Sequence, residues 1–69
     1  MTTLIPKKQS AMAAWNVLLD DSTALLATPG IHHKLLIKRA NEMHSLQIVS
    51  PEELSDMLEL ADGALAYAI

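Results

Sequence analysis

Three histidines, His32, His33 and His44, carry the side chains of this chain that most readily bind a transition metal. A metal site needs three or four ligands that converge on one ion. On a helix, His32 and His33 would point about 100° apart, and His33 and His44 would lie roughly 16 Å apart along the axis. One helix therefore cannot bring them to one ion, and only a site shared across a dimer would do so. We expect no metal site and partly exposed histidines.

Carboxylates stand in adjacent pairs, and carboxylate pairs are the groups that general acid–base catalysis often uses. Glu52 and Glu53 fall at a helix start, and Asp20 and Asp21 fall at a surface position, which explains both pairs without catalysis. The two glycines stand alone, so no phosphate-binding glycine loop, nucleophile elbow or calcium loop is present. The sequence predicts no enzyme, no catalytic residues, no cofactor and no small-molecule substrate.

Charge is distributed unevenly along the chain, whose formal net charge is -3. Residues 47–69 contain five acidic side chains and no basic one. On a helix four of these acids, Glu52, Asp56, Glu59 and Asp62, occupy the side opposite the main apolar stripe, where they form a solvated face or an acidic surface that binds a partner. We predict a partner-binding surface on this segment, formed by Glu52, Asp56, Glu59, Leu60, Tyr67 and Ile69.

A basic group, Lys34, Lys38 and Arg39, is the candidate contact for nucleic acid. The turn at 47–50 resembles that of a helix-turn-helix, but the helix after it has no Lys or Arg, and DNA phosphates would repel its acids. A nucleic-acid-associated regulator is therefore an alternative function. An acidic inhibitor that mimics nucleic acid is another.

Arg39 interrupts an otherwise apolar arc of its helix, formed by Leu35, Leu36, Ala40, Met43 and Leu46. We expect its stem to pack while the guanidinium points to water or pairs with an acid of the C-terminal helix. The functional alternative for Arg39 is contact with a partner or an anion.

The elements that position these residues should be helices, because the apolar residues are mainly Leu, Ala, Ile and Met. Ser50-Pro51-Glu52-Glu53 has the N-cap, the first-turn proline and the capping-box acid of a helix start, and Val49 and Leu54 have the spacing of a hydrophobic staple. Thr28-Pro29 repeats the cap and proline more weakly. The sequence predicts an all-α, three-helix up-down-up bundle with helices at about 6–27, 29–46 and 51–68, or four helices if the first breaks near Asp20–Ser22.

Helical wheels give each predicted helix one apolar side that should face the core. They predict a core formed by Trp15, Leu18, Leu19, Leu26, Leu36, Met43, Leu54, Leu58, Ala61 and Leu65. The uncharged segment 64–69 should fold back, so that Leu65 and Tyr67 complete the bundle or a dimer seam. If the segment is free, it is a docking peptide or a degradation signal that a protease reads.

With 69 residues the chain should form one domain, 1–69. It has no Cys, so packing alone must hold a core that at this size rarely contributes more than ~3 to 5 kcal/mol. Hydrophobic residues make up 51% of the chain and the mean hydropathy is +0.23, which is more apolar surface than a small monomer hides. We predict an interaction or regulatory protein that forms a homodimer or binds another protein. The absence of a signal-peptide pattern and of a long apolar run predicts a cytoplasmic protein that does not enter a membrane.

Overall fold

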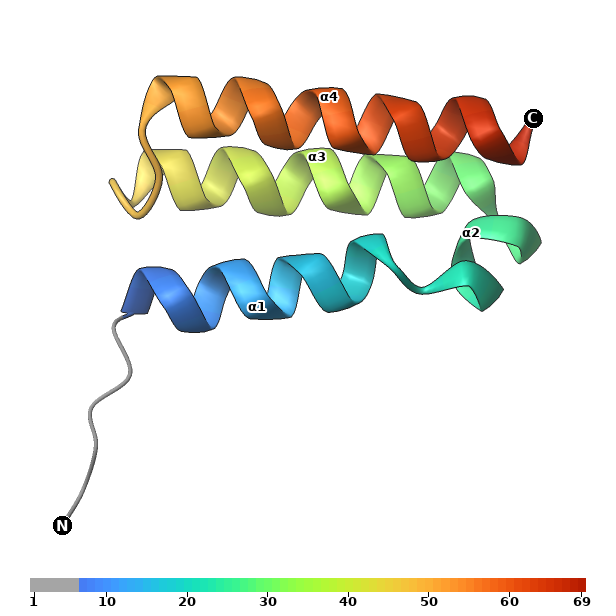
Figure 1. Cartoon of the computed structure of the whole chain (residues 1–69), viewed down its shortest axis with the longest axis horizontal. Coiled ribbons are helices and arrows are strands. Elements are labelled where there is room, and N and C mark those ends of the chain that lie inside the picture. The colour runs from blue at the N-terminus through green and yellow to red at the C-terminus, as the bar shows by residue number, and fades with distance from the viewer. Residues whose placement is uncertain (1–6) are drawn as a thin grey trace, which may run out of the picture.

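The computed structural model describes residues 7–69, which form four helices and no strand. The helices are α1 (Lys7–Leu19), α2 (Ser22–Ala27), α3 (Pro29–Ser45) and α4 (Pro51–Ala68). The three long helices lie side by side and alternate in direction, and the short α2 joins α1 to α3 (Figure 1). The prediction of an all-α, up-down-up bundle is confirmed, in its four-helix form. Residue 6, where the first helix was expected to begin, lies outside the described residues.

The first helix breaks at Asp20 and Asp21, so the expectation of one continuous helix over 6–27 is wrong. The Asp21 carboxylate accepts a hydrogen bond from the backbone N–H of Ala24 at 3.1 Å, which makes Asp21 the N-cap of α2. A side chain that caps a new helix competes with continuation of the old one. The break also changes which side chains face inward. Leu25 is buried and Leu26 is 63% exposed, so Leu26 does not belong to the core.

α3 begins at Pro29, where the sequence predicts a helix start. The expected side-chain cap from Thr28 is absent, however. The Thr28 hydroxyl instead donates to the backbone carbonyl of Ala24 at 3.2 Å, and the Thr28 backbone N–H donates to the same oxygen at 2.9 Å. Thr28 therefore ends α2, and the preset φ of Pro29 helps to start α3.

The turn between α3 and α4 is closed by two backbone hydrogen bonds typical of a Schellman motif. The N–H of Ile48 donates to the carbonyl of Met43 at 2.8 Å, and the N–H of Gln47 donates to the carbonyl of His44 at 2.9 Å. Gln47 has a φ of 60°, the left-handed conformation that glycine usually supplies. The turn reverses the chain, so α4 runs antiparallel to α3.

The predicted start of α4 at Pro51 is confirmed, and so is its capping box. The N–H of Glu53 donates to the Ser50 hydroxyl oxygen at 3.1 Å, and the N–H of Ser50 donates to the Glu53 carboxylate at 3.0 Å. Val49 is buried and Leu54 packs against the core, as expected of a hydrophobic staple.

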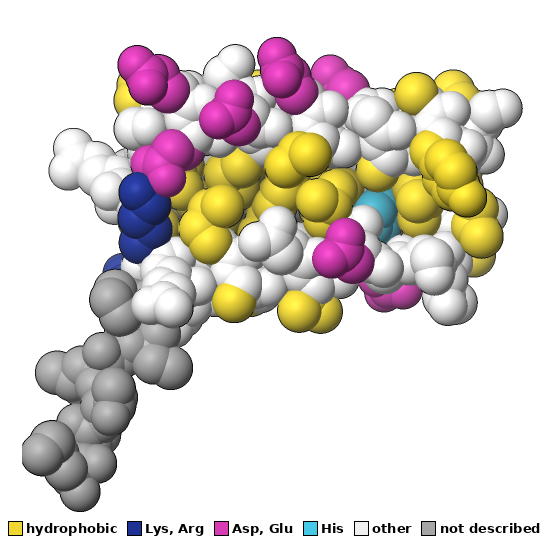
Figure 2. Space-filling model, viewed as in Figure 1, with side chains coloured by type: hydrophobic (Ala, Val, Ile, Leu, Met, Phe, Trp, Pro, Cys, Tyr) yellow, Lys and Arg dark blue, Asp and Glu magenta, His cyan; other side chains and the backbone are white. Residues whose placement is uncertain are grey.

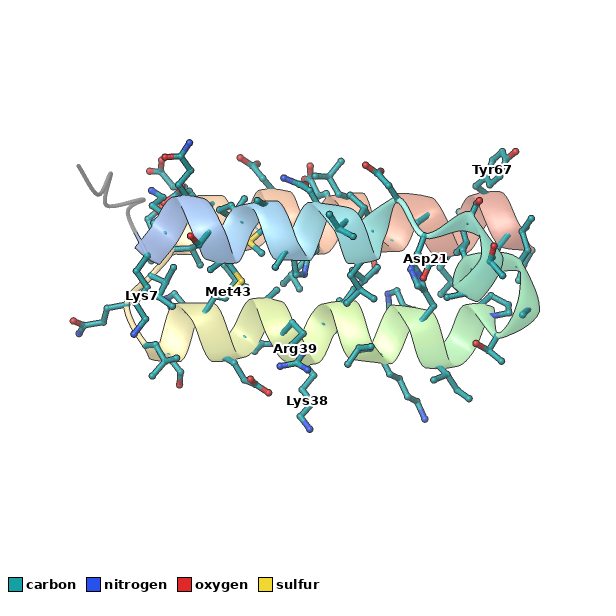
Figure 3. The ribbon with its side chains drawn as sticks, turned by 90° about the horizontal axis from the view of Figure 1, so that it is seen from below. Lys7, Asp21, Lys38, Arg39, Met43 and Tyr67 are labelled. Atoms are coloured by element: carbon teal, nitrogen blue, oxygen red, sulfur yellow. The ribbon has the colours of Figure 1, made fainter. Side chains whose placement is uncertain are left out.

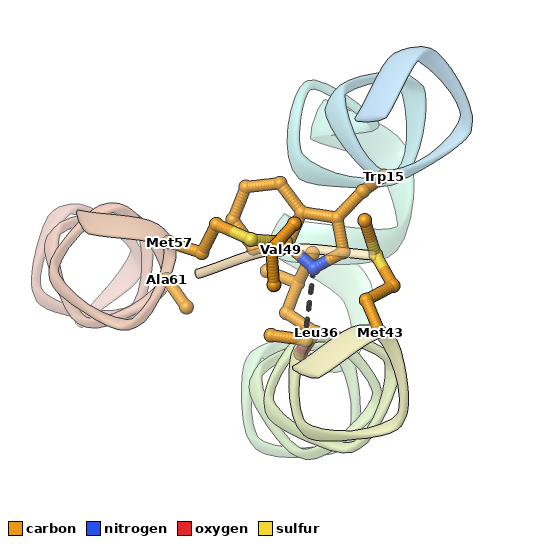
Figure 4. Close-up of a cluster of buried hydrophobic side chains, with 7 residues drawn as sticks. Trp15, Leu36, Met43, Val49, Met57 and Ala61 are labelled. Atoms are coloured by element: carbon orange, nitrogen blue, oxygen red, sulfur yellow. Dashed lines mark hydrogen bonds between the residues drawn. The ribbon is translucent and has the colours of Figure 1, made fainter. Parts of the chain in front are cut away.

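The core lies where the three long helices meet around Trp15 (Figure 4). The Trp15 indole N–H donates to the backbone carbonyl of Leu36 at 3.0 Å, which ties α1 to α3. Ala40 of α3 and Ala61 of α4 are both fully buried, so α3 and α4 approach closely through small side chains. Met57 of α4, which is 2% exposed, belongs to the same buried cluster as Trp15.

Most of the predicted core is confirmed. Trp15, Leu36, Met43 and Ala61 are buried. Five further predicted residues are partly buried: Leu18, Leu19, Leu54, Leu58 and Leu65. Leu35 and Leu46, which the wheel placed on the core side of their helix, are exposed. At the C-terminus Tyr67 is 81% exposed, so it does not complete the bundle, and its alternative place in a dimer seam stays a prediction.

An ion pair joins the start of α1 to the start of α4. The Lys8 ammonium lies 2.7 Å from one carboxylate oxygen of Glu53 and donates to the other at 2.8 Å. The hydrogen bond from Lys8 and the backbone hydrogen bond from Ser50 hold the pKa of Glu53 below its ordinary value. One carboxylate therefore serves both the capping box and the contact between helices.

Replacing Trp15 tests whether its indole holds α1 on the bundle. Trp15→Phe keeps an aromatic ring but removes the donor to Leu36, and we expect it to lower the free energy of unfolding by about 1 to 3 kcal/mol. Urea unfolding followed by far-UV circular dichroism measures this change. Val17→Ala, at an exposed position of the same helix, is the control and should change stability by less than about 0.5 kcal/mol. Equal stability of Trp15→Phe and the native chain would contradict this role.

The ion pair predicts how stability depends on pH. Because folding lowers the pKa of Glu53, the contact stabilises the fold above the ordinary glutamate pKa of about 4.3, and this contribution is lost as pH falls through the folded-state pKa. Lys8→Gln should lower stability at neutral pH and make its loss on acidification shallower. Urea midpoints measured from neutral to acidic pH check this. Lys7→Gln removes the same charge one residue away and is the control, and superimposable profiles for Lys8→Gln and native protein would contradict the assignment.

Candidate functional site

A groove of about 480 Å³ lies between α1 and α3. Figure 3 looks onto this side of the molecule, with α1 above α3 and Met43 between them. Apolar side chains form most of the lining, and Arg39 and Glu42 are its charged members. The lining residues are Ala11, Ala14, Trp15 and Leu18 of α1, and Leu35, Arg39, Glu42, Met43 and Leu46 of α3.

The groove exists because α1 presents alanines toward α3. Ala11 and Ala14 are three residues apart and lie on one side of the helix, where their short side chains leave space. The Trp15 indole closes the inner side of this space and is itself only 3% exposed. The two alanines are too short to cover the leucines opposite them, and Leu35 is 36% exposed and Leu46 is 65% exposed. The arc of α3 that was expected to face the core therefore faces the groove.

Charge in the groove comes from Arg39 and Glu42, one turn apart on α3. A guanidinium nitrogen of Arg39 lies 3.9 Å from a carboxylate oxygen of Glu42, and both side chains are about half exposed. Exposed pairs of this length contribute little to stability. Of the two expectations for the Arg39 guanidinium, the structure shows the one that points to water, since the side chain is 60% exposed and its ion-pair contact is with Glu42 of its own helix rather than with an acid of α4. Both charges remain open to a partner.

The predicted acidic surface lies on the outer side of α4, away from the groove. Its six residues, Glu52, Asp56, Glu59, Leu60, Tyr67 and Ile69, are all exposed. Figure 2 shows acidic side chains along the α4 edge of the molecule and apolar ones in the band below it. From Glu52 to Ile69 the helix extends about 26 Å, so these residues form a row and do not converge on one hollow.

The predicted basic patch is exposed but divided. Lys34, Lys38 and Arg39 all lie on the surface of α3. Lys38 points away from α1 in Figure 3, whereas Arg39 lines the groove. Arg39 therefore belongs to the groove, whereas Lys38 belongs to the outer surface of α3.

Two histidines make specific contacts with neighbouring helices. His33 Nε2 lies 2.8 Å from a carboxylate oxygen of Asp62, which joins α3 to α4. His32 is 2% exposed, so the expectation that it is partly exposed is wrong. Its Nε2 lies 2.7 Å from the backbone carbonyl of Leu18, in the last turn of α1. The same carbonyl also accepts from the backbone N–H of Asp21 at 3.3 Å, so His32 gives the carbonyl at the break after α1 a second, shorter hydrogen bond.

Within residues 7–69, no three His, Asp or Glu side chains are arranged to hold a metal ion. None of the helices in this range combines the length and the apolar character needed to cross a membrane.

Sequence reasoning missed the groove, although Arg39 carried a signal for it. A cation in the middle of an apolar arc indicates that the arc is partly solvated. The alanines at positions 11 and 14 were the complementary signal, since they cannot cover the leucines of a neighbouring helix. Together these residues mark a seam between two helices that is only half closed.

Comparisons with models of known families, with curated proteins and with solved structures found no match for this chain. Function must therefore be inferred from the groove and the charged surfaces themselves.

The contact of His32 predicts its tautomer. A carbonyl oxygen can only accept, so His32 must donate from Nε2, and its buried Nδ1 is then a lone-pair nitrogen with no partner among the described residues. Two-bond proton–nitrogen correlation spectra of the neutral imidazoles should show only the Nε2–H tautomer for His32. The less buried His44 should show a mixture. A signal from an Nδ1–H tautomer at His32 would contradict the contact.

Proposed function

We propose that this protein is a small, non-enzymatic interaction protein whose groove between α1 and α3 receives an apolar surface of a protein chain. The observation that carries the proposal is the exposure of Leu35 and Leu46 beside a hollow lined by alanines. Large apolar side chains grouped at an open groove are typical of surfaces that bind other proteins.

The shape and chemistry of the groove favour a protein segment over a small molecule. Sites for small molecules enclose the ligand and aim several polar groups at it. Here the charged lining residues are Arg39 and Glu42, which are about half exposed and adjacent on one helix. The lining extends over Leu35–Leu46, about 16 Å along the helix axis, which suits three turns of a partner helix.

The acidic surface of α4 contributes at longer range in this proposal. Glu52, Asp56 and Glu59 are exposed and lie outside the groove, so they do not touch a segment bound there. A row of like charges steers an approaching partner and disfavours acidic ones.

Photo-crosslinking at two neighbouring alanines tests the proposal. A photoreactive amino acid at position 14 would face the groove, and the same amino acid at position 13 would be exposed but outside the groove lining. We expect covalent adducts with protein chains from position 14 and few or none from position 13, in purified protein and in an extract of the native host.

A second substitution makes the result specific to the groove. Leu46→Glu, at an exposed position of the lining, should suppress the adducts from position 14 because a carboxylate resists burial against apolar side chains. Circular dichroism should show an unchanged helical fold. Equal adduct yields from positions 13 and 14, or no effect of Leu46→Glu, would overturn the proposed function.

A further inference from the structure

Three residues of α3 and its C-cap residue form a stripe along the groove: Leu35, Arg39, Glu42 and Leu46. Their spacing of four, three and four residues keeps them within about 60° of one another around the helix, which is the spacing of a coiled-coil seam. All four side chains are at least one-third exposed. The stripe is therefore an unoccupied seam beside the buried side of the same helix.

The order of residues in the stripe is symmetric. Leucines stand at its two ends, and Arg39 and Glu42 stand at equal distances from the midpoint between Ala40 and Asn41. If a second copy of α3 crosses antiparallel with a two-fold axis at this midpoint, Leu35 meets the partner's Leu46 and Arg39 meets the partner's Glu42. A parallel crossing would instead place arginine against arginine and glutamate against glutamate.

A second hollow extends the apolar surface on the other side of the stripe. It measures about 550 Å³ and is lined by Lys38, Asn41, Glu42, Ser45 and Leu46. It shares Glu42 and Leu46 with the groove, so the stripe lies between two hollows. A helix laid along the stripe would cover both.

We propose that the occupant of the groove is a second copy of this chain, paired through an antiparallel, two-fold contact of α3 with α3. This inference rests on the proposed function and specifies its partner. In a two-fold contact each favourable pair occurs twice, so one Arg39–Glu42 match gives two ion pairs across the interface. The short side chains of Ala11 and Ala14 let the second helix approach α1 as well.

Charge reversal tests the pairing. Arg39→Glu places acids against acids, and Glu42→Arg places bases against bases, so each variant alone should raise the dimer dissociation constant at least about tenfold. An equimolar mixture of the two variants should restore dimers, because each acidic position then faces a basic one. Light scattering on a sizing column across a concentration series measures the masses. Lys34→Glu reverses an exposed charge on the same helix outside the stripe and is the control.

Cysteine crosslinking tests the register without altering charge. The chain has no Cys, so Leu35→Cys and Leu46→Cys introduce the only thiols. Under mild oxidation, a mixture of the two variants should form disulfide-linked dimers in much higher yield than either variant alone. The mixed dimer identifies position 35 of one copy as the neighbour of position 46 of the other.

The outcomes separate this inference from the proposed function. Restored dimers in the charge-reversed mixture, together with the mixed disulfide, support the antiparallel pair. A monomer at every concentration overturns it. So does a dimer whose dissociation constant neither charge reversal changes. If the monomer still gives groove-specific adducts with other proteins, the proposed function survives without self-pairing. If position 14 gives no more adducts than position 13, both fail.

Discussion

The hydrogen bond from the Trp15 indole to the Leu36 carbonyl is the constraint on which the arrangement of the helices depends. A buried indole N–H must find an acceptor, and here it finds one on the backbone of a neighbouring helix. α3 and α4 already pack closely through Ala40 and Ala61. The large ring keeps α1 outside that pair, and the alanines of α1 beside the ring leave the gap that becomes the groove.

The helix boundaries could be predicted because their causes are local. Ser50, Pro51 and Glu53 form a capping box within four residues, and the structure contains both of its hydrogen bonds. The break at Asp21 depends on a competition between one continuous helix and a capped new one. The spacing of apolar residues does not resolve such a competition, because the apolar residues before and after the break recur on one side of a single continuous helix. The exposure of Leu26, which was predicted to lie in the core, follows from that one event.

The candidate site could be predicted only in part. The exposure of Glu52, Asp56 and Glu59 followed from the polar side of one helix, which a wheel shows directly. The groove depends on how far two helices separated in sequence stand apart, and a wheel of either helix alone lacks that distance. Leu35 and Leu46 look like core residues on such a wheel. Their exposure is set by the alanines opposite them, twenty or more residues earlier in the chain.

Trp15 has two roles at once, because it ties α1 to the bundle and also lines the groove. Any chain that fills the groove therefore rests on the residue that holds the fold together, and it binds the folded state alone. By mass action, a ligand at a hundred times its dissociation constant adds about 2.7 kcal/mol to the free energy of unfolding. A core of this size contributes only ~3 to 5 kcal/mol, so the stabilisation from binding is comparable to the entire contribution of the core. The lifetime of this protein against proteolysis would then rise and fall with the concentration of its partner.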